Sequence, residues 1–191
     1  MKYSLSNFNK VILESGYNEK LALILIDLYK YMIEKEWIGA CHATVSVLYV
    51  ILKEEGFNPK LCIGEVKKGN IIFDHSWIEL DNKVIDLAIS MTLNNGEPMN
   101  SPVILDTNID SLNKHEIIYG IDGNGLDIEA LIALNSSFND YMDNFPFHND
   151  GLWGVMEDIT NKKININKLK IKYSNTQRYY INGKKLDNIN F

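Results

Sequence analysis

The N-terminal third of the chain carries apolar residues at the three- and four-residue spacing that is typical of amphipathic helices. This spacing predicts helices over residues 5–14, 18–36 and about 40–55. The second helix has an apolar stripe formed by Leu21, Ile24, Leu25, Leu28 and Met32. The third helix ends before Gly56, a residue type that is common just after a helix. Its apolar stripe comprises Cys41, Val45, Leu48 and Leu52, so Cys41 is expected in the first turn, on the buried side.

After residue 60 the apolar pattern changes from the period of a helix to that of a strand. Residues 60–66, 70–80 and 83–89 are apolar or alternating stretches between short polar breaks, which predicts three consecutive strands. Only Asp81 and Asn82 separate the second strand from the third. These two strands are therefore expected to form a hairpin with a two-residue turn.

The pattern is weaker over the second half of the chain. Residues 91–114 and 145–154 are rich in Asn, Pro or Gly and are expected to be irregular. Residues 115–121 predict a further strand, and residues 126–142 predict a helix. The segments KLKIKY and RYYINGKKL, within residues 168–186, predict a closing β-hairpin.

Length and composition fit one α+β domain over residues 1–191. The hydrophobic fraction of 46% and the charged fraction of 23% are ordinary for a globular protein. The longest apolar run, LALILI, is too short to span a bilayer, and the N-terminus lacks the apolar segment of a secretory signal. The 2 cysteines form neither a disulfide framework nor a CxxC metal site. We therefore expect a cytoplasmic protein that does not associate with a membrane.

Charge is distributed unevenly along the chain, whose net charge is −6. Residues 161–191 contain eight Lys or Arg and one acidic residue, a net charge of +7, which leaves −13 on residues 1–160. This basic C-terminal region would suit an anionic partner. The interpretation that we favour is a solvated strand face, whose lysines protect a sheet edge and complement the acidic body. No nucleic-acid partner is expected.

Three residues combine into a candidate catalytic group: Cys41, His75 and Asp86. If Asp81 and Asn82 form the hairpin turn, Trp77 pairs with Asp86, and His75 lies two residues further along the same face. Diagonal neighbours on one face are about 7–8 Å apart, within reach of a hydrogen bond between His and Asp side chains. A three-residue loop would place the two side chains on opposite faces.

The chemistry of a cysteine nucleophile requires such an arrangement. A thiol reacts as its thiolate, and a neighbouring imidazole together with a helix N-terminus lowers its pKa. A carboxylate behind the imidazole fixes the orientation of the ring. The backbone N–H of Cys41 would donate one hydrogen bond to the oxyanion, and the indole of Trp37 is a candidate for the second donor. Trp77 is expected to shield the His–Asp hydrogen bond from water or to belong to the core, and is a candidate substrate-binding residue.

The sequences GACHATVSVLYVILKEEGF and DHSWIELDNKVIDLA resemble the transglutaminase-like superfamily of papain-fold cysteine enzymes. The shared features are a Gly-x-Cys that opens a helix, a His-x-Trp strand and an Asp in the next strand. The resemblance implies Cys41 as nucleophile, His75 as base and Asp86 as the orienting acid. It covers residues 37–90 and implies a core over about 18–90, in which N-terminal helices pack on an antiparallel sheet. Residues of about 100–191 would form a C-terminal elaboration, and they carry no resemblance that would identify a substrate.

Other residues point less clearly to chemistry. His42 follows Cys41 but is rotated by about 100° around the helix, so it is expected at the surface or as a cap residue. Cys62 lies in an apolar strand and is expected in the core. The spacing of the histidines and cysteines matches no metal motif, so neither a metal nor a cofactor is expected.

The sequence therefore predicts a cysteine-dependent enzyme that acts on an amide or peptide bond through a thioester. A peptidase, an amidase and an acyltransferase to an amine remain open, with a peptide, a protein or a small amide as substrate. Arylamine N-acetyltransferases share the Cys–His–Asp order, but the shorter chain and the lack of an arginine before Cys41 count against that family. The alternative from another class is a non-catalytic binding module of the same fold that uses the basic C-terminal region.

Overall fold

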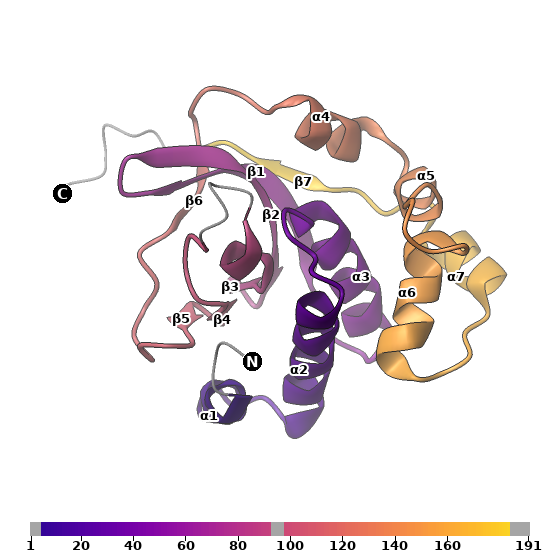
Figure 1. Cartoon of the computed structure of the whole chain (residues 1–191), viewed down its shortest axis with the longest axis horizontal. Coiled ribbons are helices and arrows are strands. Elements are labelled where there is room, and N and C mark those ends of the chain that lie inside the picture. Colours follow the sequence, from indigo (N-terminus) through magenta and orange to yellow (C-terminus); the bar gives the residue numbers. More distant parts are fainter. Residues whose placement is uncertain (1–4, 93–97, 184–191) are drawn as a thin grey trace.

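The computed structural model describes residues 5–92 and 98–183, which form an α+β structure (Figure 1). The helices are α1 (Leu5–Glu14), α2 (Glu19–Glu34), α3 (Cys41–Glu54), the 3-10 helix η1 (Ala88–Met91), α4 (Ile128–Asn135), α5 (Phe138–Asp143), α6 (Gly151–Thr160) and α7 (Ile166–Tyr173). The strands are β1 (Lys60–Lys68), β2 (Ile71–Leu80), β3 (Lys83–Asp86), β4 (Val103–Ile104), β5 (Thr107–Asn108), β6 (Ile118–Ile121) and β7 (Tyr179–Ile181).

The strands form one sheet in the order β5-β4-β3-β2-β1-β6, and β7 also pairs with β1. All of these pairings are antiparallel except that of β7 with β1, which is parallel. The predicted strands over residues 60–66 and 70–80 are confirmed with small shifts at their ends. The third strand is shorter than expected, because the chain turns into η1 after Asp86. The segment expected to be irregular contains the short hairpin of β4 and β5.

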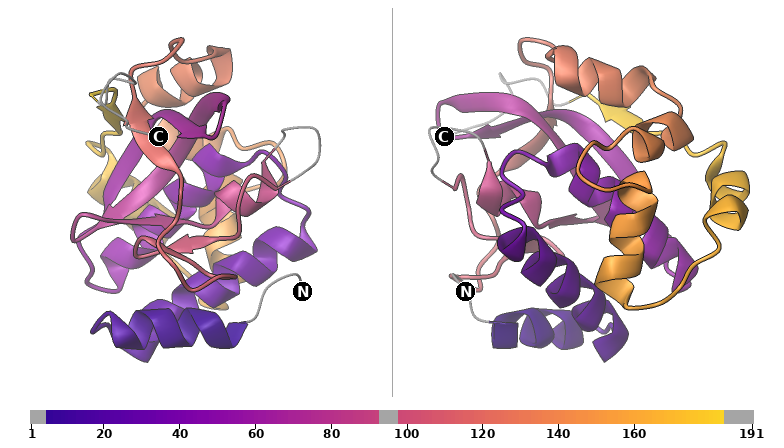
Figure 2. Two further views of the ribbon diagram at one scale, coloured as in Figure 1. Left: turned by 90° about the vertical axis from the view of Figure 1, so that its left-hand side faces the viewer. Right: turned by 45° about the vertical axis from the view of Figure 1, so that its right-hand side comes forward.

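Helix α3 is the central helix of the molecule. It packs on β1 and β2 with one side and against α2 and α6 with the other (Figures 1 and 2). Ten of its 14 residues are buried, although the sequence predicted only one apolar stripe. Small side chains such as Ala43 and Ser46 complete its buried surface, and α2 and α6 pack against the helix in addition to the sheet. Cys41, the candidate nucleophile, therefore lies at the N-terminal end of a helix that is packed on several sides.

The C-terminal half differs most from the sequence-based expectation. The expected helix over residues 126–142 is broken into α4 and α5, because Ser137 begins a new helix by accepting a hydrogen bond from the backbone N–H of Asp140. Helix α6 begins inside the segment that was expected to be irregular. The predicted closing hairpin is wrong: KLKIKY belongs to α7, and β7 pairs with β1 instead.

Lysines of the C-terminal region lie against the acidic body, as one interpretation of the charge pattern expected. Lys162 and Lys172 pair with Glu55 and Glu54 at the end of α3. Lys163 and Lys170 pair with acidic residues of α6 and α5. These lysines lie on α7 or the loop before it rather than on a strand, so the expected edge-protecting role does not apply to them. Lys184 and Lys185 lie outside the described residues.

Candidate active site

Cys41 is the first residue of α3, and its side chain is 9% exposed. The turn before it contains Gly39 with a φ of 71°, a left-handed conformation that glycine adopts without steric cost. The backbone N–H of Gly39 donates to the carbonyl oxygen of Met91 at 2.7 Å, which ties this turn to the end of η1. The N-cap Ala40 has no side chain that could accept a hydrogen bond from the first turn of the helix. The N-terminal N–H groups of α3 thus favour negative charge at Cys41.

His75 and Asp86 meet across the predicted hairpin. Asp81 and Asn82 both have positive φ, 51° and 61°, and they form a two-residue turn that pairs Leu80 with Lys83. This is the register that the sequence predicted. It brings Nε2 of His75 to 2.8 Å from Oδ2 of Asp86, with both side chains buried. The ring's Nε2–H donates to the carboxylate, which leaves Nδ1 for the thiol.

The carboxylate of Asp86 is fully buried and has three donors. His75 and the phenol of Tyr119 both donate to Oδ2, the latter at 2.9 Å, and the backbone N–H of Ile89 donates to Oδ1 at 3.0 Å. A buried carboxylate needs such partners to remain ionised. Sequence reasoning missed Tyr119, because it lies on β6, 33 residues after Asp86, and no local pattern marks it.

The thiol and the imidazole perturb each other's pKa. Burial alone would raise the pKa of the Cys41 thiol, but its interactions with His42 and His75 outweigh burial and lower that pKa to about 5. Burial alone would lower the pKa of His75, but the Asp86 carboxylate and the Cys41 thiolate outweigh burial and raise that pKa to about 10. Between these two values the pair is a thiolate and an imidazolium, the reactive form of a cysteine nucleophile.

His42 is placed differently from the sequence-based expectation. Its half-buried side chain lines the cavity in front of Cys41, and its Nδ1 lies 2.6 Å from the hydroxyl oxygen of Ser76. The hydroxyl of Ser46 donates to the backbone carbonyl of His42 at 2.7 Å. The rotation of His42 around the helix does not bring its side chain to the surface, because β2 covers this side of α3. The only local hint of this contact in the sequence is Ser76, a polar residue next to His75 that can bond to an imidazole.

The cavity in front of Cys41 has a volume of about 530 Å³. Cys41, His42 and His75 line it together with residues from β2, η1 and α4. Neither tryptophan that the sequence suggested for substrate or oxyanion binding is among its lining residues. Trp37 packs edge-on against Tyr31 and Phe145, with ring centroids 5.3 and 5.5 Å away.

Trp77 is fully buried and cannot contact a substrate. Its ring packs against that of Tyr119, with the two centroids 5.0 Å apart. Tyr119 in turn bonds to Asp86, so Trp77 lies behind the carboxylate network. This position confirms the expected place of Trp77 in the core. Its shielding of the His–Asp hydrogen bond from water stays a prediction.

Cys62 and His148 lie outside this site. Cys62 is fully buried on β1, and burial raises the pKa of its thiol to about 12, as expected for a core cysteine. His148 lies beside Asp158 on α6, with 3.8 Å between its Nε2 and the carboxylate. Over residues 5–92 and 98–183, no group of three or more His, Cys, Asp or Glu side chains could hold a metal ion. Within the same ranges no helix has the length and apolar character needed to cross a membrane.

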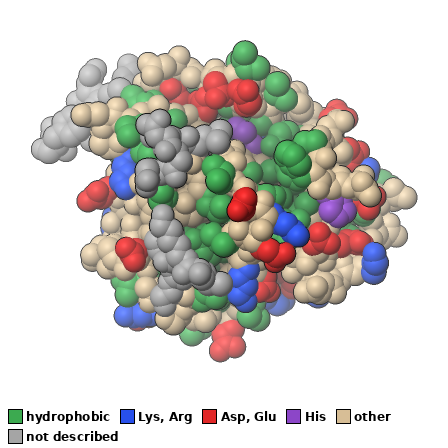
Figure 3. All heavy atoms as spheres, in the orientation of Figure 1, with side chains coloured by type: hydrophobic (Ala, Val, Ile, Leu, Met, Phe, Trp, Pro, Cys, Tyr) green, Lys and Arg blue, Asp and Glu red, His purple; other side chains and the backbone are tan. Residues whose placement is uncertain are grey.

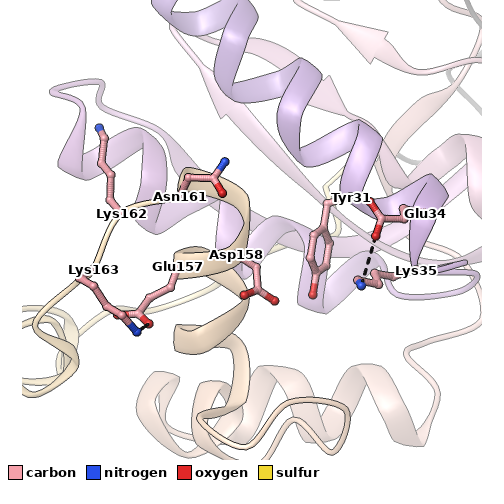
Figure 4. A pocket seen from close by; sticks show the side chains of 8 residues that line it. All are labelled: Tyr31, Glu34, Lys35, Glu157, Asp158, Asn161, Lys162 and Lys163. Carbon is pink, nitrogen blue, oxygen red and sulfur yellow. Dashed lines mark hydrogen bonds and ion pairs between the residues drawn. The ribbon is translucent and has the colours of Figure 1, made fainter.

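A second hollow, of about 470 Å³, lies between the C-terminal ends of α2 and α6 (Figure 4). Its charged side chains largely compensate one another: Lys35 pairs with Glu34, and Lys163 pairs with Glu157. None of its described lining residues is a cysteine, a histidine or a serine. This hollow therefore lacks the thiol and imidazole that meet at the cavity of Cys41.

No protein-family model, curated protein or solved structure matches this chain. Within the site, α3, β2 and β3 bring Cys41, His75 and Asp86 together.

Proposed function

We propose that this chain is a cysteine-dependent acyl-transfer enzyme that acts on an amide or peptide bond. The observation that carries the proposal is the buried chain of contacts from the Cys41 thiol through His75 to Asp86, which opens onto a cavity. The resemblance of residues 37–90 to the transglutaminase-like superfamily supports the same conclusion. Peptidase, amidase and amine acyltransferase activities all use this first half-reaction.

In the first half-reaction the Cys41 thiolate attacks the carbonyl carbon of the amide. A C–S bond forms, and the carbonyl oxygen becomes an oxyanion. The oxyanion forms beside the start of α3, where the backbone N–H of Cys41 has no acceptor within the helix and can donate to it. His75 then gives its proton to the leaving nitrogen, the C–N bond breaks, and a thioester remains on Cys41.

In the second half-reaction water or an amine attacks the thioester. His75, now neutral, takes the proton of the attacking group, and the C–S bond breaks to restore the thiolate and the imidazolium. Asp86 holds the ring in one orientation throughout, and it is itself held by Tyr119 and Ile89. A hydrolase and an acyltransferase differ only in which acceptor enters.

The pH dependence of thiol alkylation tests this proposal. The rate of carboxamidomethylation of Cys41 by iodoacetamide would be measured from pH 3 to pH 10, with the modified residue identified by mass spectrometry. We expect an apparent pKa near 5 for Cys41, because the two histidines stabilise the thiolate, against about 8.5 for a free cysteine. Cys62 serves as an internal control and should not react, because it is buried and its pKa is raised.

His75→Ala should move the apparent pKa of Cys41 upward by about 1 unit or more, towards the value of a free thiol. His148→Ala, which removes a histidine outside the cavity, should leave the pH profile unchanged. If Cys41 titrates like a free thiol and its profile is the same in His75→Ala, the catalytic proposal fails. The chain would then be better described as a binding module of this fold.

A further inference from the structure

The cavity that holds the nucleophile has one strongly acidic wall. Asp74 on β2, Asp127 at the N-cap of α4 and Glu129 in its first turn all line the cavity with Cys41. No lysine or arginine is found among the described residues that line it. In the space-filling view acidic side chains gather over the start of α4, beside a histidine at the surface (Figure 3). The charged side chains of this wall are therefore all acidic, and they lie next to the site of the proposed reaction.

Asp74 is the innermost of the three carboxylates and is incompletely partnered. Its Oδ2 accepts a hydrogen bond from the backbone N–H of Asp127 at 2.6 Å. Its Oδ1 is inaccessible to solvent and has no hydrogen-bond partner within the described chain. Burial, followed by the nearby carboxylates of Asp127 and Glu65, raises the pKa of Asp74 to about 6. One oxygen of this carboxylate therefore has a hydrogen-bonding capacity that the described chain leaves unfilled.

Behind Asp74 a further carboxylate is held by the backbone. The side chain of Glu65, which is 3% exposed, accepts hydrogen bonds from the N–H groups of Gly123, Asn124 and Gly125 at 3.0, 2.7 and 3.1 Å. These bonds fix the loop that leads into α4, and thus fix the position of Asp127 relative to β2. Both carboxylate oxygens of Glu65 therefore have hydrogen-bond donors, whereas Oδ1 of Asp74 has none within the described chain.

Local structural roles account for only part of the acidic wall. Asp127 caps α4 by accepting from the N–H of Ala130 at 2.8 Å, a role that a neutral asparagine would fill equally well. Glu129 lies in the first turn of α4, where a negative charge is favourable. Neither role explains why both charges face the cavity of Cys41, or why Oδ1 of Asp74 is left without a donor.

We propose that this cavity recognises a substrate that carries a positive charge close to the amide bond under attack, as an ammonium or guanidinium group of a lysine or arginine side chain does. The acidic wall of Asp74, Asp127 and Glu129 would draw the cationic group into the cavity and place the neighbouring carbonyl at Cys41. This inference rests on the proposed function, because it names the substrate class of that same site.

Two small thiol reagents of opposite charge test the inference at Cys41 itself. Both 2-aminoethyl methanethiosulfonate, a cation, and 2-sulfonatoethyl methanethiosulfonate, an anion, form a mixed disulfide with a thiolate and release methanesulfinate. The second-order rate of each at Cys41 is measured at pH 7.5 and divided by its rate with glutathione. We expect the ratio of cation to anion to exceed unity by about 10-fold or more. The Cys41 thiolate and the His75 imidazolium offset each other, so the three carboxylates leave an excess of negative charge that concentrates cations in the cleft.

Two double variants, each of which removes two negative charges, distinguish the effect of the acidic wall from the effect of the protein's net charge. Asp127→Asn with Glu129→Gln should lower the cation preference several-fold, and the asparagine retains the cap of α4. Glu14→Gln with Glu19→Gln alters exposed residues of α1 and α2, at the opposite end of the molecule from α4 (Figure 1), and should leave the preference unchanged. In the unaltered protein, raising the salt concentration from 0.05 to 0.5 M should reduce the preference, because salt screens the wall.

A ratio of cation rate to anion rate at Cys41 that is no greater than the same ratio for glutathione would overturn the inference. So would a preference that both double variants retain, since the wall would then not be its source. The iodoacetamide profile and its dependence on His75 use a neutral reagent, and they decide the proposed function separately. A reactive, His75-dependent Cys41 without charge preference would leave the enzyme proposal in place and remove this one.

Discussion

At the scale of single residues, the site depends on how one buried carboxylate is satisfied. Asp86 has no exposed surface, and its charge is compensated by the His75 ring, the Tyr119 hydroxyl and the Ile89 amide. The sequence predicted the first of these contacts from strand register. The other two depend on where η1 turns and where β6 lies, which no spacing in the sequence specifies.

Tyr119→Phe tests the contribution of the hydroxyl. The variant removes a hydrogen bond to a charged, buried group, and we expect the free energy of unfolding to fall by about 1–3 kcal/mol. Urea unfolding monitored by circular dichroism measures the change. Tyr180→Phe removes a hydroxyl from an exposed tyrosine and should alter stability by less than about 0.5 kcal/mol. Equal losses in the two variants would show that Asp86 does not need the Tyr119 hydroxyl.

At the scale of elements, α7 shows how an alternating pattern can mislead. In KLKIKY the lysines alternate with Leu169, Ile171 and Tyr173, which predicts a strand with one apolar face. In the structure Leu169 and Tyr173 are buried and Ile171 is exposed, which is the i, i+4 pattern of a helix. Asn165, three residues before Lys168, accepts from the N–H of that lysine and begins the helix. The capping residue Asn165 is therefore the feature of the sequence that favours a helix over a strand here.

Replacement of two nearby asparagines distinguishes a helix from a strand at this position. Asn165→Ala removes the N-cap of α7, and the free energy of unfolding should fall by about 1 kcal/mol. Asn167→Ala lies inside the helix at an exposed position, where alanine is the better helix former, and should raise stability by up to about 0.5 kcal/mol. Urea unfolding of both variants measures the two signs. A strand at this position would give no such difference in sign.

At the scale of the whole molecule, the C-terminal segment ties the sheet to the helices. β7 pairs with residues 62–64 of β1, while β6 pairs with the following part of the same strand. Just before β7, the guanidinium of Arg178 lies 4.5 Å from the ring centroid of Tyr141 on α5 and donates to the hydroxyl of Ser46 on α3 at 3.2 Å. The lysine pairs of this region are exposed and contribute little individually. The pairing of β7 and the contacts of Arg178, together with the buried side chains of α7, therefore hold this segment in place.

Gly64→Ala tests the close approach of β7 to β1. A Cβ at Gly64 would lie 2.3 Å from the backbone oxygen of Ile181, so β7 must move. We expect a loss of about 1–3 kcal/mol of stability in urea unfolding. Tryptic cleavage after Arg178, followed by mass spectrometry, should also become faster as β7 separates from β1. Gly183→Ala, where a Cβ meets no described atom within 4 Å, should change neither measurement.

The sequence by itself determined the N-terminal helices, the hairpin turn at Asp81 and Asn82, and hence the approach of His75 to Asp86. These features depend on periodicity and turn length, which are local properties of the chain. Only the tertiary structure decided the partners of Asp86, the inward position of His42, the burial of Trp77 and the acidic wall of the cavity. Each of these depends on contacts between segments far apart in the sequence, and such contacts leave no periodic pattern in it.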